Sequence, residues 1–353
     1  MEADSTTYEK STVESNETYF PFVVCPLDLQ LYKDIINDDD GTQATERQLV
    51  ERLQKLDLLH KNLKCPTGDP SCELICKNAR VVDKLQWVCK GCNKRQSLRL
   101  GSFFQNLQCS IVQVLQVILA WSQDADVVVA AEHFGVKPRV ALNIYNRLDV
   151  LAIDAQNEIK LGGDNSVVLA EMYPDCMNRL SPDTTDQPHR HRILMLADTN
   201  QIPTTYWLHV IKKDPKNCSG NLFENQAVKA EIKGVLSTVT LPNSTLVMGH
   251  NMPPIEGTTS IQHLAQHCDA DLQNFMASRI WRQAVTLCAA SRELCSGSGC
   301  VRAAQRYLSV SLLRTRTREL FRRMLELISF FFKLLVSLLS DTHHESFLYV
   351  LSI

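Results

Sequence analysis

The chain has 353 residues and a formal net charge of −2, with 44% hydrophobic and 22% charged residues. This length predicts two or three domains, and the composition is that of a globular protein, which excludes a wholly disordered chain. The charge is unevenly spread: residues 1–50 hold eleven Asp or Glu against three Lys or Arg, 77–99 hold seven Lys or Arg against one Asp, and 302–323 hold seven Arg against one Glu. Two basic segments behind an acidic head favour a nucleic-acid-binding protein, although each basic run could also be a solvated helix face.

The cysteine count and the termini bear on the cellular setting. Thirteen cysteines are present, and residues 1–20 are polar and acidic, unlike a signal peptide. We therefore expect reduced thiols in a nuclear or cytosolic protein, with a subset bound to metal. The apolar segment 324–340 is short for a membrane span, and Glu326 and Lys333 interrupt it. We expect residues 326–353 to form a buried or oligomer-forming helix and a tail.

The first 64 residues contain no recognisable catalytic or metal-binding motif. Residues 1–26 are rich in Ser, Thr and Glu, which predicts a disordered acidic N-terminus. Residues 27–64 predict a helical lead-in, with one helix from Leu27 and, after a break at 38–41, an amphipathic helix over 45–59.

The next segment, 65–100, predicts a zinc ribbon. Its core is a C-x-x-C pair, and three further cysteines precede a hairpin with expected strands at 80–82 and 85–88. Tetrahedral zinc takes four ligands, two from each of two knuckles. We expect structural zinc on Cys65, Cys72, Cys89 and Cys92, with Cys76 as the alternate to Cys65. The competing interpretation is a metal-free hairpin with buried cysteines.

Residues 101–160 predict three helices. The first carries an apolar stripe from Ile111 to Trp121, the second covers 126–134, and the third covers 139–151 after a Gly-Val-Lys-Pro turn. Helix, tight turn and helix predict a helix-turn-helix, whose last helix would enter the major groove of DNA; the alternative is a plain helical hairpin. The expected DNA contacts are Lys90, Lys94, Arg95 and Arg99 on the ribbon, and Lys137, Arg139, Asn143, Asn146 and Arg147 on the third helix.

Beyond Gly162-Gly163 the pattern changes to strands. Strand-like runs occur at 166–172, 193–197, 205–211 and 245–248, with helical segments near 225–236 and 259–277 and two long helices after Ala303. This order predicts an α/β sheet domain over 161–325. The basic loop 189–192 could contact phosphate or simply be exposed.

Several segments together carry a family resemblance. They are C-P…C…W-x-C-x-x-C, SLRLGSFF at 97–104, Trp121, FGVKPRVALNIYNRL at 134–148, LGGDNSVVLAEMY at 161–173 and RYLSVSLLRTRTRELF at 306–321. In this order they resemble the Merlin superfamily of DDE transposases and related bacterial insertion-sequence transposases, over roughly residues 45–330. The resemblance implies a zinc ribbon and a helix-turn-helix that bind transposon ends, followed by an RNase H-like catalytic domain.

The resemblance also implies a catalytic site, and this chain departs from it. In the family, three carboxylates hold two divalent metals for attack on a phosphodiester, and Mg²⁺ suits such ligands. The matching positions here are Ala170, His250 (or Gly249) and Ser278, and none is acidic. Glu171 and Asp198 remain nearby, and Glu171 is expected to face away from the metal side because neighbouring strand residues point to opposite faces.

Taken together, the sequence predicts an α+β multidomain protein: a small zinc ribbon, a helix-turn-helix region and a degenerate RNase H-like α/β domain. The expected function is binding of double-stranded DNA without cleavage, with structural zinc and no small-molecule substrate; a homo-oligomer is left open. One alternative is an active transposase that uses Mg²⁺. A second is a regulatory module whose ribbon binds protein, and a third is a decayed reading frame.

Overall fold

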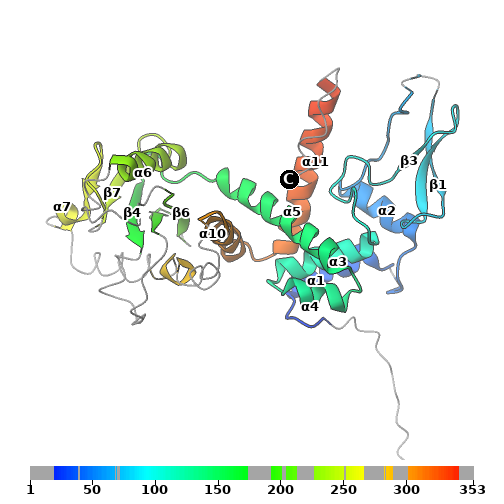
Figure 1. Cartoon of the computed structure of the whole chain (residues 1–353), viewed down its shortest axis with the longest axis horizontal. Helices are drawn as coiled ribbons and strands as arrows, with labels where there is room; N and C mark the ends of the chain where they lie inside the picture. The colour runs from blue at the N-terminus through cyan, green and yellow to red at the C-terminus, as the bar shows by residue number, and fades with distance from the viewer. Residues whose placement is uncertain are drawn as a thin grey trace, which may run out of the picture.

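A computed structural model describes residues 20–38, 40–67, 69, 72–173, 192–200, 204–212, 226–249, 252–265, 282, 284–288 and 301–341. The fold is α+β, with a small antiparallel sheet near the N-terminus and a mixed five-stranded sheet with helices further along the chain. Figure 1 shows the two sheets at opposite ends of an elongated molecule, with a group of helices between them. The helix α5 runs from this group toward the larger sheet.

The N-terminal helices pack against the central helices. α1 (Pro26–Ile36) and α2 (Glu46–Lys55) confirm the two predicted lead-in helices. A capping box begins α2, because Thr45 accepts from the backbone of Gln48 while the Gln48 side chain accepts from the backbone of Thr45. The folded part begins before the predicted boundary at residue 26, since the ring of Phe20 packs 6.0 Å from that of Phe134.

The small sheet has the order β1-β2-β3, from β1 (Leu74–Asn78), β2 (Leu85–Cys89) and β3 (Arg95–Ser97). The prediction of a strand at 80–82 was wrong, because these residues form the turn between β1 and β2. The Ala79 N–H donates to the Lys84 carbonyl at 2.7 Å, and Lys84 adopts a positive φ of 53°. The turn therefore begins directly after β1 ends at Asn78.

The central helices are α3 (Ile111–Ser122), α4 (Val127–His133) and α5 (Pro138–Asn157), which confirms three helices and extends the last beyond its predicted end. The turn after α4 is a Schellman motif. Gly135 has a φ of 62° and donates to the Glu132 carbonyl, while Val136 donates to the Ala131 carbonyl. Val136 is buried, so this turn sets the angle at which α5 leaves α4.

The larger sheet has the order β6-β5-β4-β7-β8. The strands β4, β5 and β6 are antiparallel, whereas β7 runs parallel to β4 and β8 runs parallel to β7. The four predicted strands are confirmed, and the two-residue β8 was not predicted. The strand bounds are β4 (Val167–Tyr173), β5 (Ile193–Asp198), β6 (Thr205–Val210), β7 (Thr245–Met248) and β8 (Thr259–Ser260).

Helices lie on both faces of this sheet. α6 (Gln226–Val239) packs on the face that carries Ala170 and Met172, and α10 (Val301–Arg316) packs on the face that carries Leu169 and Tyr173. Of the predicted helix at 259–277, the described residues contain α7 (Ile261–Ala265).

α10 also protects the edge of the sheet at β6. Gln305 donates to the Leu208 carbonyl at 2.9 Å and accepts from the Val210 N–H at 2.7 Å, and Arg316 donates to the Tyr206 carbonyl. Because these groups occupy the outer hydrogen bonds of β6, the edge is closed to another strand. Burial lowers the pKa of Arg316 to about 10.

The last described helix, α11 (Leu320–Asp341), runs through the predicted boundary at 325/326 without a break. Its first turns bury Phe321, Met324 and Ile328 in the core shared with α1 and α3. Among the described helices, none combines the length and the apolar character that a membrane span requires.

One buried carboxylate joins three of these helices. Asp28 in α1 accepts from the Gln123 amide at 3.0 Å and from the Phe321 N–H at 3.2 Å, so it ties α1 to the ends of α3 and α11. We expect Asp28→Ala to cost about 2–3 kcal/mol in the free energy of unfolding, because buried donors lose their acceptor. Urea denaturation measures this, with the exposed Asp34→Ala as a control that should stay within about 0.5 kcal/mol.

Candidate metal centre and polar groove

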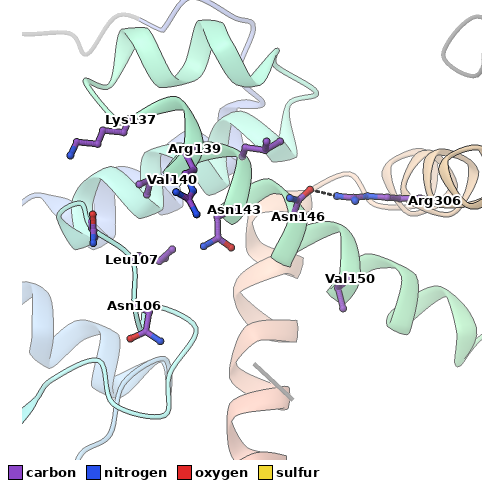
Figure 2. A pocket seen from close by; sticks show the side chains of 11 residues that line it. Asn106, Leu107, Lys137, Arg139, Val140, Asn143, Asn146, Val150 and Arg306 are labelled. Carbon is purple, nitrogen blue, oxygen red and sulfur yellow. Dashed lines mark hydrogen bonds between the residues drawn. The ribbon is translucent and has the colours of Figure 1, made fainter. Parts of the chain in front are cut away.

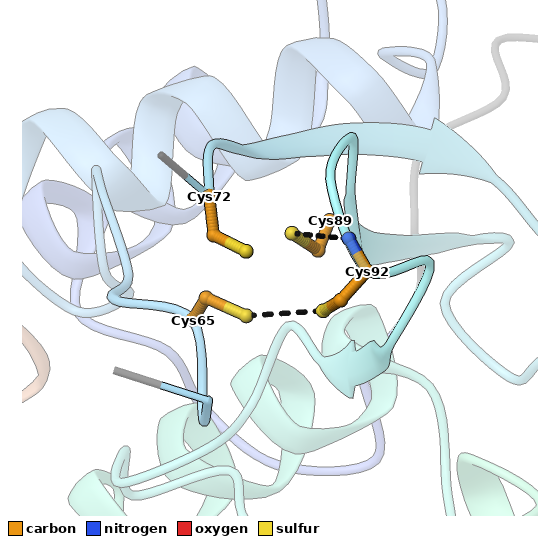
Figure 3. Close-up of side chains that lie close together, drawn as sticks. All are labelled: Cys65, Cys72, Cys89 and Cys92. Carbon is orange, nitrogen blue, oxygen red and sulfur yellow. Dashed lines mark hydrogen bonds between the residues drawn. The ribbon is translucent and has the colours of Figure 1, made fainter. Parts of the chain in front are cut away.

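Four cysteines converge at one end of the small sheet. Cys65, Cys72, Cys89 and Cys92 have sulfur atoms within 4.8 Å of one another, and Cys65 Sγ lies 3.3 Å from Cys92 Sγ. Figure 3 shows the four side chains pointing toward one another from two separate loops. Zinc–thiolate bonds of about 2.3 Å in a tetrahedron place the sulfurs about 3.8 Å apart. The donor set and spacing therefore fit a zinc ion. The four cysteines would supply all four of its ligands.

The second pair lies in a tight knuckle that begins at Cys89, the last residue of β2. Cys89 donates its N–H to the Lys94 carbonyl and accepts at its own carbonyl from Asn93, whose φ is 55°. The Cys92 N–H points at the sulfur of Cys89, 3.4 Å away. An added Cβ at Gly91 would lie 3.1 Å from the sulfur of Cys72, so a glycine lets the two knuckles approach.

The thiols strongly affect one another's ionisation. Hydrogen bonding with Thr67 lowers the pKa of Cys65 to about 6. The same hydroxyl lowers the pKa of Cys72, but its thiol neighbours and burial outweigh this and raise it to about 12. Thiolates this close repel one another, so the group keeps at least one proton until a cation binds. Binding of a divalent metal would release that proton.

Cys76, the alternate ligand, lies elsewhere. It sits in the middle of β1, paired with Trp87 of β2, and its side chain packs against the main core. Burial raises the pKa of this thiol, which suits an apolar position. Across the described ranges, the four-cysteine group is the one cluster of three or more Cys, His, Asp or Glu close enough to share a metal.

A second feature is a polar groove along the first half of α5. It has a volume of about 820 Å³ and lies between α5 and the loop 106–108. Figure 2 shows Lys137, Arg139, Asn143 and Asn146 along one side and Asn106 opposite them. Its lining contains three cations and no acid; these residues are Asn106, Leu107, Gln108, Lys137, Arg139, Val140, Leu142, Asn143, Asn146, Val150 and Arg306.

The predicted DNA contacts on α5 divide into two groups. Lys137, Arg139 and Asn143 are exposed and line the groove. Arg147 instead turns inward and donates to the carbonyls of Phe103 and Gln105 at 2.7 and 3.1 Å. Burial lowers the pKa of Arg147, which here anchors α5 to the preceding loop.

The ribbon cations also differ in position. Lys94 and Arg95 are exposed, and Lys90 forms an exposed ion pair with Glu73 at 2.7 Å. Arg99 is 5% exposed, and its guanidinium pairs with Asp83 through Nε at 2.7 Å. It also donates to the carbonyls of two residues in the 107–109 segment, so no surface is left for a phosphate. We therefore replace its assignment as a DNA contact with a structural one.

Sequence reasoning missed part of the groove. Asn106 and Gln108 lie in a short loop without a motif, and Arg306 comes from α10, far along the chain. Arg306 donates to Asp149 at 2.7 Å and to Asn146 at 2.6 Å, which closes one end of the groove. The basic run 302–323 includes Arg306, so charge alone could have suggested it. The same run also contains Arg314, which stacks 4.8 Å over the ring of Trp121 and lies outside the groove lining, so the run does not identify which arginine lines the groove.

The acid positions in the larger sheet are only partly described. Ala170 is buried in the layer beneath α6. Glu171 faces the opposite side, and its carboxylate occupies the space where a side chain at Gly249 would stand. Asp198 is 2% exposed and accepts from the Gly162 and Asn200 backbones, so it caps a turn. His250, Ser278 and the loop residues 189–191 lie outside the described residues.

Comparisons with protein-family models, with curated proteins and with solved structures found no match to this chain.

The cysteine group gives a direct metal test. We expect the purified protein to hold about one equivalent of zinc and Cys89→Ser to hold almost none, because three thiols and a hydroxyl bind far more weakly. Zinc content by mass spectrometry of the metal checks this, with Cys76→Ser as the matched control. Loss of zinc in both variants, or in neither, would contradict the assigned ligand set.

The buried ion pair gives a stability test. Arg99→Ala leaves Asp83 buried without its cation, and we expect a loss of about 3–5 kcal/mol in the free energy of unfolding. Chemical denaturation measures the loss. The exposed Lys94→Ala serves as the control and should change stability by less than about 0.5 kcal/mol. An Arg99→Ala protein as stable as the parent would mean that Arg99 is solvated instead.

Proposed function

We propose that this protein binds double-stranded DNA through the groove on α5 and the neighbouring ribbon. The observation that carries the proposal is the exposed face of α5, where Arg139, Asn143 and Asn146 follow one another at spacings of three and four residues. A helix enters the major groove with such a face, on which Arg pairs with guanine and Asn with adenine.

The shape of the surrounding surface supports this role. The groove is open, contains only cationic or neutral groups, and begins at the N-terminus of α5, where Lys137 occupies the N-cap position without a side-chain cap. Backbone N–H groups at a helix N-terminus favour a phosphate. The amides of Asn106 and Gln108 on the facing wall offer further donors, so a phosphate backbone has partners on both walls of the groove.

The ribbon supports the same function. A zinc ion on four cysteines would hold the knuckle rigid, and Lys94 and Arg95 project from the strand that follows it. Rigid cations lose little entropy when they meet a phosphate. In this interpretation zinc is structural, and the DNA partner implies a nuclear protein.

The larger sheet supports the resemblance to DDE transposases. Counted from β4, its strands stand in the order third, second, first, fourth and fifth, with the first three antiparallel and the rest parallel to the first. This is the order of an RNase H-like sheet. We infer that the chain derives from such a transposase and that its helix-turn-helix once bound transposon ends.

We propose that DNA is bound but not cut. A two-metal site needs several carboxylates on one face, and Ala170 provides none while Asp198 is committed to a turn. Glu171 is the acid that remains beside the end of β7. The competing function is an active transposase with Mg²⁺ on acids outside the described residues. Mg²⁺-dependent nicking of a bound duplex would establish that alternative.

One observation favours a second function, docking of a protein on the ribbon. Val81 and Val82 at the turn between β1 and β2 are 47% and 61% exposed. Two adjacent exposed valines on a rigid hairpin suit an apolar partner surface better than a phosphate. On α11, Phe330 and Leu334 are likewise exposed one turn apart, which favours a homo-oligomer.

The salt dependence of binding tests the main proposal. We expect affinity for a panel of duplexes to fall steeply between about 50 and 200 mM salt, because bound phosphates release counterions. Arg139→Ala should weaken binding about tenfold or lower the log–log salt slope by about one unit. Fluorescence anisotropy measures both.

The matched control is Lys233→Ala, an exposed cation on α6 at the far end of the molecule (Figure 1). It should leave both the affinity and the slope unchanged. Equal effects of the two variants would mean that binding follows overall charge and that the groove is not the DNA site.

A further inference from the structure

The N-terminal segment is anchored beside the groove. Phe20 and Phe22 pack on Phe134 with ring centres 6.0 and 6.3 Å apart, and the Cys25 N–H donates to the Gln123 side chain at 2.9 Å. Phe134 stands only three residues before Lys137, the first cation of the groove lining. The chain that precedes Phe20 is therefore tethered next to the entrance of the groove.

The tethered segment carries the opposite charge. Residues 1–19 contain five carboxylates, Glu2, Asp4, Glu9, Glu14 and Glu17, against the single cation Lys10. Nineteen residues reach up to about 60 Å when extended. This is longer than α5, whose 20 residues span about 30 Å. Every part of the groove is thus within reach of several of these acids.

The groove carries a positive charge that is not fully neutralised by the described residues. Its lining contains three cations and no acid, and only Arg306 among the three forms an ion pair, with Asp149. Lys137 and Arg139 form no ion pair with the described residues. A nearby chain of spaced carboxylates presents the same kind of charge to them as a phosphate backbone does.

We propose that residues 1–19 occupy the α5 groove when DNA is absent and compete with DNA for Lys137 and Arg139. The contact itself is independent of DNA, whereas its inhibitory effect rests on the proposed function. A tether this short gives an effective concentration in the millimolar range, so even weak ion pairs keep the segment in place. Salt screens exposed pairs of this kind, so the inhibition is strongest at low ionic strength.

The first experiment compares DNA binding by the full chain and by a variant of equal length whose segment is neutral. The variant carries Glu2→Gln, Asp4→Asn, Glu9→Gln, Glu14→Gln and Glu17→Gln. At about 50 mM salt we expect it to bind a random duplex three to ten times more tightly, and at about 300 mM salt the difference should shrink below twofold. A control with Ser5→Ala, Ser11→Ala and Thr12→Ala keeps the charge and should bind like the parent. Equal affinity of parent and neutral variant at low salt would overturn the inference.

The second experiment needs no DNA. A zero-length carbodiimide reagent joins a carboxylate to an amine in contact with it, and Lys137 offers such an amine. We expect mass spectrometry to find intramolecular cross-links between acids of residues 1–19 and Lys137, and to find none in the neutral variant or at 300 mM salt. Cross-links without any DNA binding would support the contact while rejecting the proposed function. DNA binding without cross-links to Lys137 would reject the contact.

Discussion

The buried ion pair between Arg99 and Asp83 is the interaction on which the candidate DNA surface depends. Asp83 lies in the turn between β1 and β2, and Arg99 lies beyond β3, so the pair closes the small sheet onto itself. The same guanidinium donates to the carbonyls of Leu107 and Cys109 at 2.8 and 2.7 Å. Leu107 belongs to the groove wall that faces α5. One side chain thus links the small sheet to the segment that precedes α3, and a shift in the turn would move the wall of the groove.

Arginines in the second basic segment act in the same way between the central helices and the larger sheet. Arg306 contacts Asp149 of α5, Arg314 donates to the Trp121 carbonyl of α3, and Arg316 reaches Gln156 of α5 and β6. Guanidinium groups suit this work, because their fixed donors satisfy several carbonyls at once. A run of cations in sequence is therefore a poor guide to a free basic surface. Lys94 and Arg95 on the ribbon and Lys137 and Arg139 in the groove are exposed cations that a phosphate could reach.

Local signals in the sequence predicted most helices, most strands and the four cysteines that cluster. The apolar stripe from Ile111 to Trp121, the Gly-Val-Lys-Pro turn before α5 and the C-x-x-C pair each fix a conformation within a few residues, so no knowledge of the rest of the fold was required. One failure is a local turn that the strand-like pattern concealed, and the other depends on contacts between residues distant in sequence. Residues 80–82 look like a strand, yet Ala79 and Lys84 close a turn around them. Arg99 was predicted as a phosphate contact, whereas in the fold its guanidinium is paired with Asp83 and the Leu107 carbonyl. Spacing alone also left Cys76 open as the alternate to Cys65, and the fold brings Cys65 into the cluster.

Two positions of the larger sheet, Ala170 and Gly249, are packed in ways that suit the small residues present. The methyl group of Ala170 fills the layer beneath α6, where an ionised carboxylate would cost several kcal/mol without a partner. Glu171, one residue on, points to the other face and takes the space above Gly249. The glycine and the glutamate are thus mutually adapted, since any side chain at 249 would displace the carboxylate. The groove on α5 shares no lining residue with these positions, so their packing can change without altering the groove.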